Sequence, residues 1–525
     1  MRAPLPLLAL LSTAALNAQH VQWLTTGAIG YDTNPDMPSH LVCASGNDQV
    51  YVGRSTSLTY LYNAVHGNAV VERLNAEGEV VWSFTLGDSV LLQSMAATDG
   101  MVMLGGQFFR RLHLNGEAVL PALHGNEFPE TFLMALDQEG QLLWQRNIPS
   151  APTENLHVQA VTFDGQGRGW YATCNFFRAD IMRVDATGAV VETRPLEEAK
   201  TIGSISFDPW DGLYVSGSAS TPGITVNGSF FPLAEQYNFF VARMGVDGVT
   251  QWLQHAPDIT FQRPRVAADG SGHAYLVGTP FDSINWGSIH FQAPQWTSTF
   301  FLARLDSTGV FEWGYQPPAD GSITGQFTLG KAEAMGLDGA GNVHLLGVVQ
   351  GQVPWGNNVT TSAGGLQDRA VTLVKIDSTG TPLWEIHGGS NDHDVPQGIA
   401  VLPTGVAHVA VLARDTFLLG PYTAPLASAA LVVARIDPQG TLGLVEGTLP
   451  LRAIGAYPSP FANTFQLLGD FLPGRPLRVN IRDGAGRIVE SADRPIGLGS
   501  TLAAGCYLVE VFQDGHRGFT RVVKH

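Results

Sequence analysis

Oxygen-bearing side chains are densest at Ser390-Asn391-Asp392-His393-Asp394. Closely spaced carboxylate, amide and hydroxyl oxygens suit Ca²⁺, which takes about six to eight oxygen ligands. The cluster lacks the residue order of an EF-hand loop, and clusters of this kind usually form solvated turns. We therefore favour a turn, keep Asp392 and Asp394 as candidate Ca²⁺ ligands, and predict no other cofactor.

Motifs of catalysis are missing from the chain. It contains no His-Glu-x-x-His, no Gly-x-Ser-x-Gly and no Gly-x-x-x-x-Gly-Lys-Ser/Thr pattern. These absences argue against zincins, hydrolases with a nucleophile elbow and P-loop enzymes. The 15 histidines are scattered along the sequence. We predict no catalytic residue and a protein that is not an enzyme.

The net charge of the chain argues against a nucleic-acid-binding protein. The chain has 29 Lys and Arg against 46 Asp and Glu, a formal net charge of −17. An acidic chain without a basic run repels phosphates, so the sequence predicts no nucleic-acid partner.

Two alternating half-repeats organise residues 19–450. The first is an apolar run, often Arg-x-Asp, a turn ending in Gly, and Trp four residues later; its turn glycines recur about 60 residues apart. It ends at Trp82, Trp144, Trp252, Trp313 and Trp384. The second half-repeat is an apolar strand, usually Asp-x-x-Gly, and a strand often carrying Tyr or His. Because its aspartates recur at equivalent turns, we assign turn chemistry to Asp164, Asp208, Asp269 and Asp338.

Each half-repeat has the pattern of a β-hairpin, with alternating apolar residues around a Gly turn. Two hairpins make a four-stranded antiparallel unit that must stack on its neighbours to bury both faces. Seven copies of each half predict an all-β, seven-bladed β-propeller. A solenoid is the alternative, but solenoid repeats are usually shorter.

The ends of the repeat array predict ring closure. The last copy, at residues 430–440, lacks a Trp strand, and a spare one, HVQWLTTG, surrounds Trp23. If this strand joins the last unit, both open edges disappear. We expect Trp23 and the five repeat tryptophans to pack against neighbouring blades. The short third repeat, with Val191 and Glu192 in place of Trp, should form the thinnest blade.

Residues 1–18 have the pattern of a signal peptide. Arg2 precedes an apolar stretch from Leu5 to Leu16, which is too short to span a bilayer, and Ala18 offers a small residue for cleavage. No later segment predicts a membrane span. The odd number and wide separation of the cysteines argue against a disulfide framework, and we expect small buried residues. They are Cys43, Cys174 and Cys506.

The tail, residues 451–525, is a different module. It carries 9 basic and 6 acidic side chains, in contrast to the acidic repeats. Alternation predicts strands at 477–482, 486–490 and 506–512, with a hairpin turn at Asp483–Gly486. Several short strands in so few residues suggest a small immunoglobulin-like β-sandwich.

The repeats resemble two groups of propellers. The Arg-x-Asp-x-x-Gly-x-x-x-Trp half is similar to the tryptophan-docking strands of quinoprotein-type propellers. The segment WEIHGGSNDHDVPQGIAV, Trp384–Val401, resembles the seven-bladed repeats of exported bacterial proteins, where a Trp strand is followed by Gly-Gly-Ser and acidic residues. Both resemblances concern the fold, since propellers host many chemistries.

The tail resembles the type A C-terminal sorting domain of the type IX secretion system of Bacteroidota. The family's motifs occur here in order, with Ser459 where the first usually has Asn. The matching residues are Tyr457, Pro458, Pro460, Phe461, Asp483, Gly486, Arg487, Leu502, Gly505, Tyr507 and the basic strand Arg521–Lys524. The resemblance implies export through both membranes, recognition of the tail by the secretion machinery, and surface anchoring or release.

Two classes of function remain. We favour an exported, non-catalytic binding or adhesion protein whose propeller holds an extracellular glycan or protein. The alternative is an exported propeller enzyme, either a quinoprotein-like dehydrogenase or a polysaccharide-degrading enzyme. A polar pocket on the ring axis, built from unlike residues of several blades, would favour a functional site over a purely structural role for the ring.

Overall fold

The structure is a computed structural model that describes most of the chain. The described residues are 20–29, 40–55, 59–61, 64–87, 89–124, 128–151, 154–258, 263–281, 283–292, 300–317, 325–357, 359–363, 369–390, 392–437, 455–468, 477–483, 487–513 and 516–525. The predicted signal peptide, Gly440 and Gly486 lie outside them. The chain divides into two compact units, Met1–Gly440 and Thr441–His525. Every named element in the described residues is a β-strand, so the protein is all-β.

Seven antiparallel sheets of four or more strands make up the described part of residues 20–437. We number them 1 to 7 in chain order. From the first strand outward, sheet 1 contains β2 (His40–Ala44), β3 (Val50–Ser55), β6 (Ala69–Leu74) and β7 (Val80–Gly87). Sheet 2 contains β8 (Val90–Thr98), β9 (Met101–Phe108), β12 (Glu130–Asp137) and β13 (Leu142–Ile148). Sheet 3 contains β14 (His157–Phe163), β15 (Gly169–Cys174), β16 (Arg178–Val184) and β17 (Val190–Glu197).

The remaining four sheets repeat this order. Sheet 4 contains β18 (Ala199–Phe207), β19 (Leu213–Ala219), β22 (Asn238–Met244) and β23 (Thr250–Pro257), and sheet 5 contains β24 (Arg265–Ala268), β25 (Ala274–Gly278), β28 (Phe301–Leu305) and β29 (Phe311–Tyr315). Sheet 6 contains β31 (Met335–Leu337) with β30 (Gly325–Leu329), then β32 (Val343–Gly356), β34 (Arg369–Ile376) and β35 (Pro382–Gly389). Sheet 7 contains β36 (Val395–Val401), β37 (Ala407–Ala413), β40 (Ala430–Asp437) and β1 (His20–Ala28).

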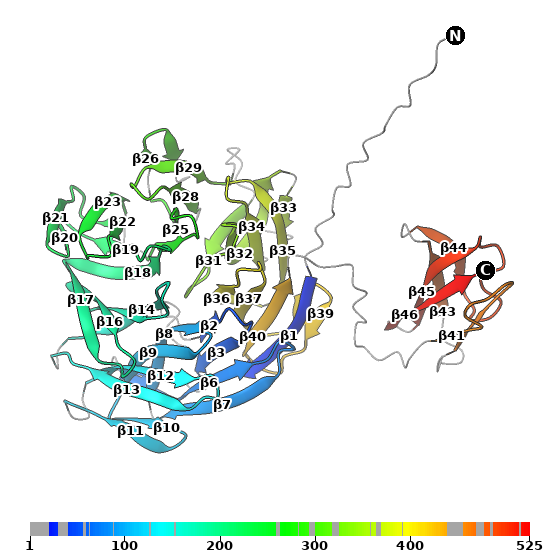
Figure 1. Cartoon of the computed structure of the whole chain (residues 1–525), viewed down its shortest axis with the longest axis horizontal. Helices are drawn as coiled ribbons and strands as arrows, with labels where there is room; N and C mark the ends of the chain where they lie inside the picture. Colours follow the sequence, from blue (N-terminus) through cyan, green and yellow to red (C-terminus); the bar gives the residue numbers. More distant parts are fainter. Residues whose placement is uncertain are drawn as a thin grey trace, which may run out of the picture. The chain divides into compact units, whose positions relative to one another are not determined.

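The first strands of the seven sheets form a closed ring. Neighbouring first strands contact one another in the order β2, β8, β14, β18, β24, β31, β36 and back to β2. Figure 1 shows the sheets arranged around this common centre. The ring closes through the N-terminal strand, because β1 pairs antiparallel with β40 and places Trp23 opposite Arg435. This pairing confirms the closure predicted from the spare Trp strand.

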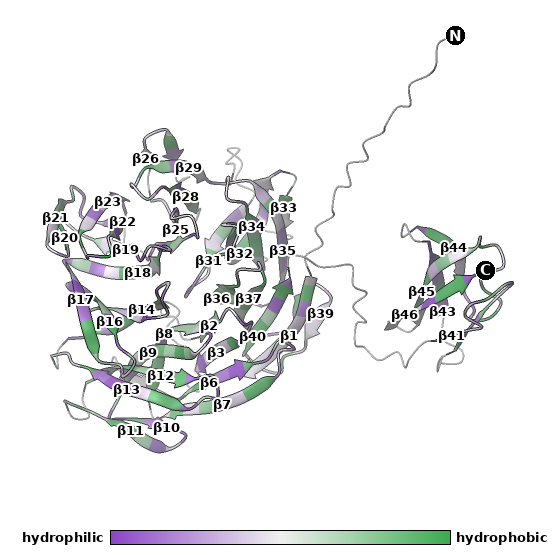
Figure 2. Cartoon of the chain, in the orientation of Figure 1, coloured by the Kyte–Doolittle hydropathy of each residue, from purple (hydrophilic) through white to green (hydrophobic). Residues whose placement is uncertain are grey.

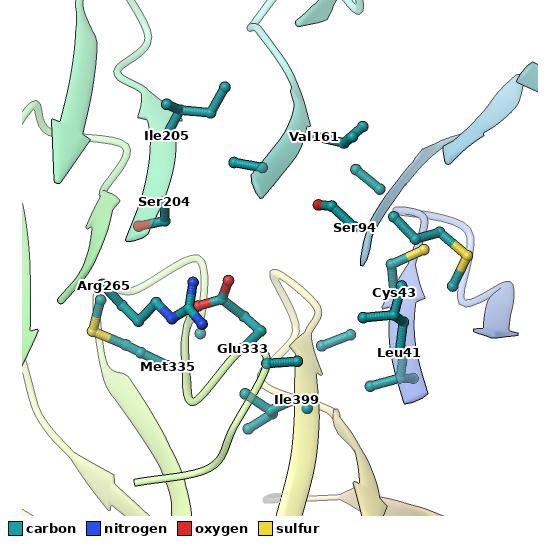
Figure 3. Close-up of a pocket in the computed structure, with 18 of the residues that line it drawn as sticks. Leu41, Cys43, Ser94, Val161, Ser204, Ile205, Arg265, Glu333, Met335 and Ile399 are labelled. Atoms are coloured by element: carbon teal, nitrogen blue, oxygen red, sulfur yellow. The ribbon is translucent and has the colours of Figure 1, made fainter. Parts of the chain in front are cut away.

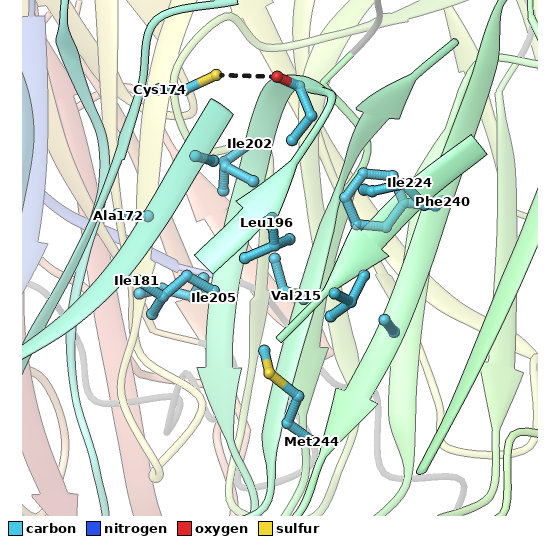
Figure 4. Close-up of a cluster of buried hydrophobic side chains, with 14 of the residues drawn as sticks. Ala172, Cys174, Ile181, Leu196, Ile202, Ile205, Val215, Ile224, Phe240 and Met244 are labelled. Carbon is cyan, nitrogen blue, oxygen red and sulfur yellow. Dashed lines mark hydrogen bonds between the residues drawn. The ribbon is translucent and has the colours of Figure 1, made fainter. Parts of the chain in front are cut away.

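Apolar side chains fill the space between adjacent sheets. Figure 4 shows the cluster between sheets 3 and 4, where Leu196 and Ile202 meet Val215 and Phe240. The second strand of sheet 7 is an example of a deeply buried element: every residue of β37 is buried, and Figure 2 colours this strand mainly as hydrophobic. Face-to-face packing of neighbouring sheets therefore supplies the core of the ring.

Short hairpins are inserted between the second and third strands of most sheets, and the sequence analysis did not predict them. Three pair with the fourth strand of the preceding sheet: β10 (Arg111–Leu114) and β11 (Glu117–Pro121) extend sheet 1, β20 (Gly223–Val226) and β21 (Ser229–Pro232) extend sheet 3, and β38 (Phe417–Leu419) and β39 (Tyr422–Ala424) extend sheet 6. The other insertions hold β4 (Thr59–Leu61) with β5 (Ala64–His66), β26 (Ile284–Trp286) with β27 (Ile289–Phe291), and β33 (Val359–Ser362) beside β32.

The predicted thin third blade is wrong. Sheet 3 has four full strands and gains β20 and β21, so it is six-stranded. Its repeat is short because only residues 175–177 join β15 to β16, where other sheets insert a hairpin. Phe176 in this tight connection has a φ of 74°.

The tail has its own small core. β41 (Gly455–Tyr457) pairs with β42 (Gln466–Leu468). A second, antiparallel sheet has the order β44-β43-β45-β46, with β43 (Leu477–Arg482), β44 (Ile488–Ala492), β45 (Gly505–Gln513) and β46 (His516–Lys524). Buried Phe461, Phe465, Val479, Val509 and Val522 pack between these strands. The C-terminal strand β46 lies at one edge of its sheet.

Candidate functional site

The repeat tryptophans connect neighbouring sheets of the ring. Trp23, Trp144 and Trp384 are buried, and Trp82, Trp252 and Trp313 are partly buried. The indole of Trp82 lies over the turn glycine Gly140 of sheet 2, and its Nε1 donates to the Gln138 carbonyl at 2.7 Å. The same pair of contacts joins Trp23 to Gly78 and Ala76, Trp252 to Gly309 and Ser307, and Trp313 to Gly380 and Ser378.

These contacts explain the glycine of each turn. Gly78 has a φ of +83°, and a Cβ there would lie 2.7 Å from the Trp23 ring. The positive φ of the turn and the close approach of the indole therefore both require glycine at this position. The tryptophans act as fasteners between sheets rather than as a binding site.

Arg194 replaces the missing tryptophan of sheet 3. Its guanidinium donates to the carbonyls of Gly245 at 3.2 Å and Val246 at 3.1 Å in the next sheet. The side chain is only 3% exposed and lies over the Trp170 ring. An arginine thus makes the link between sheets that tryptophan makes elsewhere.

The recurring aspartates have the structural role assigned to them. One oxygen of Asp208 accepts bonds from the Trp210 and Gly212 amides, and the other binds Arg243 at 2.6 Å. Asp338 caps its turn in the same way and pairs with Lys375 at 2.7 Å. Hydrogen bonds to the ionised form hold the pKa of Asp338 well below its usual range, against the opposing effect of burial.

The candidate Ca²⁺ ligands accept hydrogen bonds from their own loop. Asp394 is buried and accepts bonds from the Ser390 amide and hydroxyl, the latter at 2.8 Å. Asp392 accepts from the His393 amide at 2.6 Å. In the part of the chain that the structure describes, no group of three or more His, Cys, Asp or Glu side chains is arranged to hold a metal ion. The Ca²⁺ role of Asp392 and Asp394 stays a prediction.

The cysteines are free thiols, and one departs from expectation. Cys43 and Cys174 are buried, as expected, whereas Cys506 is exposed on β45. Cys506 occupies an alternating position of a sheet that covers the tail core with only one face. The prediction that all three are buried is therefore wrong for Cys506.

The matched residues of the tail separate into buried and exposed groups. Phe461 is buried in the tail core, and the Tyr507 hydroxyl donates to the Ala503 carbonyl at 2.8 Å. Asp483 and Arg487 form an ion pair at 2.8 Å across their turn. Gly505 begins β45, and Gly486 lies outside the described residues. Tyr457, Pro458 and Pro460 are exposed.

A cavity of about 310 Å³ lies on the axis of the ring, and we call it the axial cavity. All seven sheets line it through their first strands, and the fifth and sixth also through residues just before β24 and β31. The main lining side chains are Leu41, Cys43, Gln93, Ser94, Met95, Gln159, Val161, Ser204, Ile205, Arg263, Arg265, Glu333, Met335 and Ile399. The cavity therefore has unlike residues from several sheets around it, the arrangement expected of a functional pocket.

Charged groups gather on one side of the axial cavity. In Figure 3 the Arg265 guanidinium and the Glu333 carboxyl point toward one another. Arg265 also donates to the carbonyls of Gly203 and Lys331, the latter at 3.3 Å. Burial raises the pKa of Glu333, although the charge of Arg265 opposes this shift. Burial, together with repulsion by Arg265, lowers the pKa of Arg263 to about 10, so Arg263 stays a cation at neutral pH.

Sheet 4 holds the arginine segment in place. The Ser216 hydroxyl donates to the Pro264 carbonyl at 2.6 Å, and the Val266 amide donates to Ser204 Oγ at 2.6 Å. Residues 263–266 are thus fixed by two buried serines on the neighbouring sheet. The positions of both arginines depend on this support rather than on a loop.

β-Bulges bring polar side chains to the ring axis. Gln93 lies between paired residues Leu92 and Ser94, and Gln159 occupies a similar break in sheet 3. Such an extra residue re-aims its side chain. The Gln93 amide contacts His157 Nδ1 at 2.5 Å, and burial lowers the pKa of His157 to about 4. His157 is therefore neutral at pH 7, and its Nδ1 accepts from Gln93.

The opposite side of the axial cavity is apolar. Leu41, Cys43 and Val161, with Ser94 beside them, lie across from the charged side chains in Figure 3. Burial raises the pKa of the Cys43 thiol, which keeps it protonated and a poor nucleophile. The cavity pairs fixed charge with an apolar wall, an arrangement suited to holding a ligand.

Sequence reasoning missed this cavity, although a signal was present. Four residues ahead of the turn aspartate, other repeats have Ala160, Ser204 and Ala334, whereas the fifth has Arg265. Glu333 lies five residues before Asp338, one repeat position earlier than that of Arg265. Other repeats have small or uncharged residues at the positions equivalent to Arg265 and Glu333, and this difference marks both residues as candidates for function.

Comparison with known proteins gives no family. No family model matches the chain, and no curated protein matches it. Among solved structures, a protein from Lactobacillus plantarum has 14% identity and a TM-score of 0.37, with 74% of this chain and 98% of that chain covered.

Two further structures are similarly distant. Puromycin hydrolase has 12% identity and a TM-score of 0.40, with 93% of this chain and 62% of that chain covered. The extracellular domain of a hybrid two-component system from B. thetaiotaomicron has 10% identity and a TM-score of 0.19, with 96% of this chain and 100% of that chain covered. Because these scores are below 0.5, the similarities carry no argument about function. No helix in the described residues is long and apolar enough to cross a membrane.

Proposed function

We propose that this chain is an exported, non-catalytic binding protein built on a seven-bladed β-propeller. Each numbered sheet is then one blade, and β1 closes the ring as the outer strand of the seventh. The observation that carries the proposal is the axial cavity, where unlike polar and charged side chains from several sheets meet.

Binding is favoured over catalysis by the chemistry of the cavity wall. Its charged members are Arg263, Arg265 and Glu333, and its one thiol, Cys43, is held protonated. Nucleophilic catalysis needs an activated nucleophile within hydrogen-bonding reach of a base. The arginines and glutamines instead offer fixed donors for a ligand.

The tail is proposed as a type IX secretion sorting domain. Support comes from the sequence motifs and from the compact unit that the tail forms by itself. The exposed Tyr457, Pro458 and Pro460 are accessible to a secretion component, and they lie next to Phe461, which pairs with the C-terminal end of the edge strand β46. Delivery to the cell surface or medium of a Bacteroidota-type bacterium follows from this assignment.

A binding screen tests the ligand-holding role. The full mature chain is screened by thermal shift against glycans, polysaccharide fragments and small organic compounds, beside a Ser94→Trp variant. Ser94 lines the cavity from β8, and an indole there would fill the space. We expect ligands that stabilise the wild type and lose their effect on Ser94→Trp. Equal stabilisation of both proteins would place binding elsewhere and contradict the proposal.

A further inference from the structure

The charges around the axial cavity do not balance. Arg265 faces Glu333, and their opposite charges offset one another. Among the described residues, no ion pair joins Arg263 to an acidic side chain, and the charge of Arg265 repels it. Arg263 is partly exposed, and with Glu333 ionised the three groups leave one positive charge without an acidic partner.

The opposite wall limits what can neutralise this charge. Leu41 and Val161 offer aliphatic surface there, and no aromatic ring appears among the described residues that line the cavity to stack a sugar. A volume of about 310 Å³ exceeds what an inorganic ion fills. A ligand that satisfies both sides needs one anionic group and an aliphatic body.

We propose that the axial cavity binds an organic monocarboxylate, with Arg263 as its main anion-binding residue. This inference rests on the proposed binding role and names its ligand class. The planar guanidinium of Arg263 matches a carboxylate in a two-bond arrangement. Arg265, which faces Glu333 and donates to two main-chain carbonyls, adds to the positive field, and the aliphatic chain lies against β2 and β14.

The geometry also predicts a role for Glu333. Its carboxyl lowers the net charge of the cavity, so replacing it by an uncharged isostere leaves two positive charges for one anion. Glu333→Gln should therefore bind the carboxylate more tightly than the wild type does. A purely structural Glu333 would show no such gain.

Isothermal titration of the full mature chain at low salt tests the ligand class. The probes are straight and branched monocarboxylates of about four to eight carbons, each beside its primary amide and its amine, with inorganic phosphate as a further probe. We expect the best carboxylate to bind at least about tenfold more tightly than its amide, as for loss of a charge-assisted pair. The amine and phosphate should not bind measurably.

Variants connect the binding to the cavity. Arg263→Gln should weaken carboxylate binding about tenfold or more. Arg178→Gln, at an exposed arginine paired with Asp180 on β16, is the matched control and should change nothing. Folding of both variants is checked by their thermal midpoints.

The results of these experiments distinguish a failure of the monocarboxylate inference from a failure of the proposed axial binding role. Amide binding as tight as carboxylate binding, with both lost in Ser94→Trp, would overturn the monocarboxylate inference and leave the axial binding role standing. An unchanged affinity in Arg263→Gln, or no binding by any carboxylate, would also overturn the inference. Carboxylate binding unaffected by Ser94→Trp would contradict the axial site itself.

Discussion

At the residue scale, one tryptophan and one glycine fasten five pairs of neighbouring sheets in the described residues. The ring stacks on the turn glycine of the next sheet and donates to a carbonyl of the same turn, as Trp82 does with Gly140 and Gln138. A Tyr or His on the second strand lies against the same indole, as Tyr51 does with Trp82 and His408 with Trp23. The repeat pattern is therefore a pattern of contacts between sheets.

Removing one fastener should be costly. Trp144 is 6% exposed and packs against Gly188, so Trp144→Ala should lower the free energy of unfolding by about 3–5 kcal/mol. Trp210 is 64% exposed, and Trp210→Ala should cost well under half of that. Urea titrations of both variants and the wild type give the comparison. Equal costs would contradict the fastener role.

Buried histidines predict sensitivity to acid. Burial lowers the pKa of His40 and His157 to about 4 and that of His408 to about 3, below the usual 6.5. The unfolded chain binds protons first, so the stability that the neutral histidines contribute is complete above pH 6.5 and is lost as the pH falls toward 4.

The measurement is the urea midpoint between pH 7.5 and pH 4.5, which should fall. The His408 ring faces Asp48 at 3.5 Å, with Arg435 and Trp23 beside it. His408→Phe should reduce the fall if the variant folds, which its thermal midpoint at pH 7.5 shows. A pH-independent midpoint for the wild type would refute the prediction.

At the element scale, local patterns determine the strands and long-range pairing determines the cavity. Alternation and Gly turns are local, so the four-stranded units and the joining of β1 to β40 could be predicted. The inserted hairpins were missed, although Asn115-Gly116 and Asn227-Gly228 have the dipeptide typical of a tight hairpin turn. The direction of Gln93 depends on a bulge between β8 and β9, which the sequence alone does not reveal.

The closing strand gives an element-scale prediction. Deleting residues 19–27 removes most of β1, exposes the edge of β40 and unburies Val21 and Trp23. Stability should fall by several kcal/mol, and the protein should aggregate more readily on heating. Calorimetry with light scattering follows both effects. A truncated chain as stable as the wild type would show that β1 does not close the ring.

Arg194, which links sheet 3 to the next sheet in place of a tryptophan, offers a matched test. Arg194→Ala removes both bonds to the Gly245 and Val246 carbonyls and leaves two acceptors at the next turn without their donor. We expect a loss of about 1–3 kcal/mol in chemical unfolding. Arg146→Ala, which removes a single exposed bond to the Thr187 carbonyl, should cost less. The reverse order would contradict the substitution of Arg194 for tryptophan.

At the scale of the whole molecule, the chain combines a ring proposed to hold a ligand with a tail proposed to direct export. The two units differ in charge, in repeat pattern and in core, and each has its own buried cluster. A module read by a secretion machine needs to fold by itself and to present accessible residues. The tail meets both requirements through its separate core and its exposed Tyr457-Pro458-Ser459-Pro460 segment.

The most direct measurement of the central claim is the fraction of the protein outside the cell in a bacterium with a type IX system. Chains with and without residues 456–525 are compared, together with a reporter that carries a signal peptide and those residues. The account predicts that the full chain and the reporter reach the surface or medium, while the truncated chain accumulates, folded, in the periplasm. Equally efficient export of the truncated chain would contradict the sorting role of the tail.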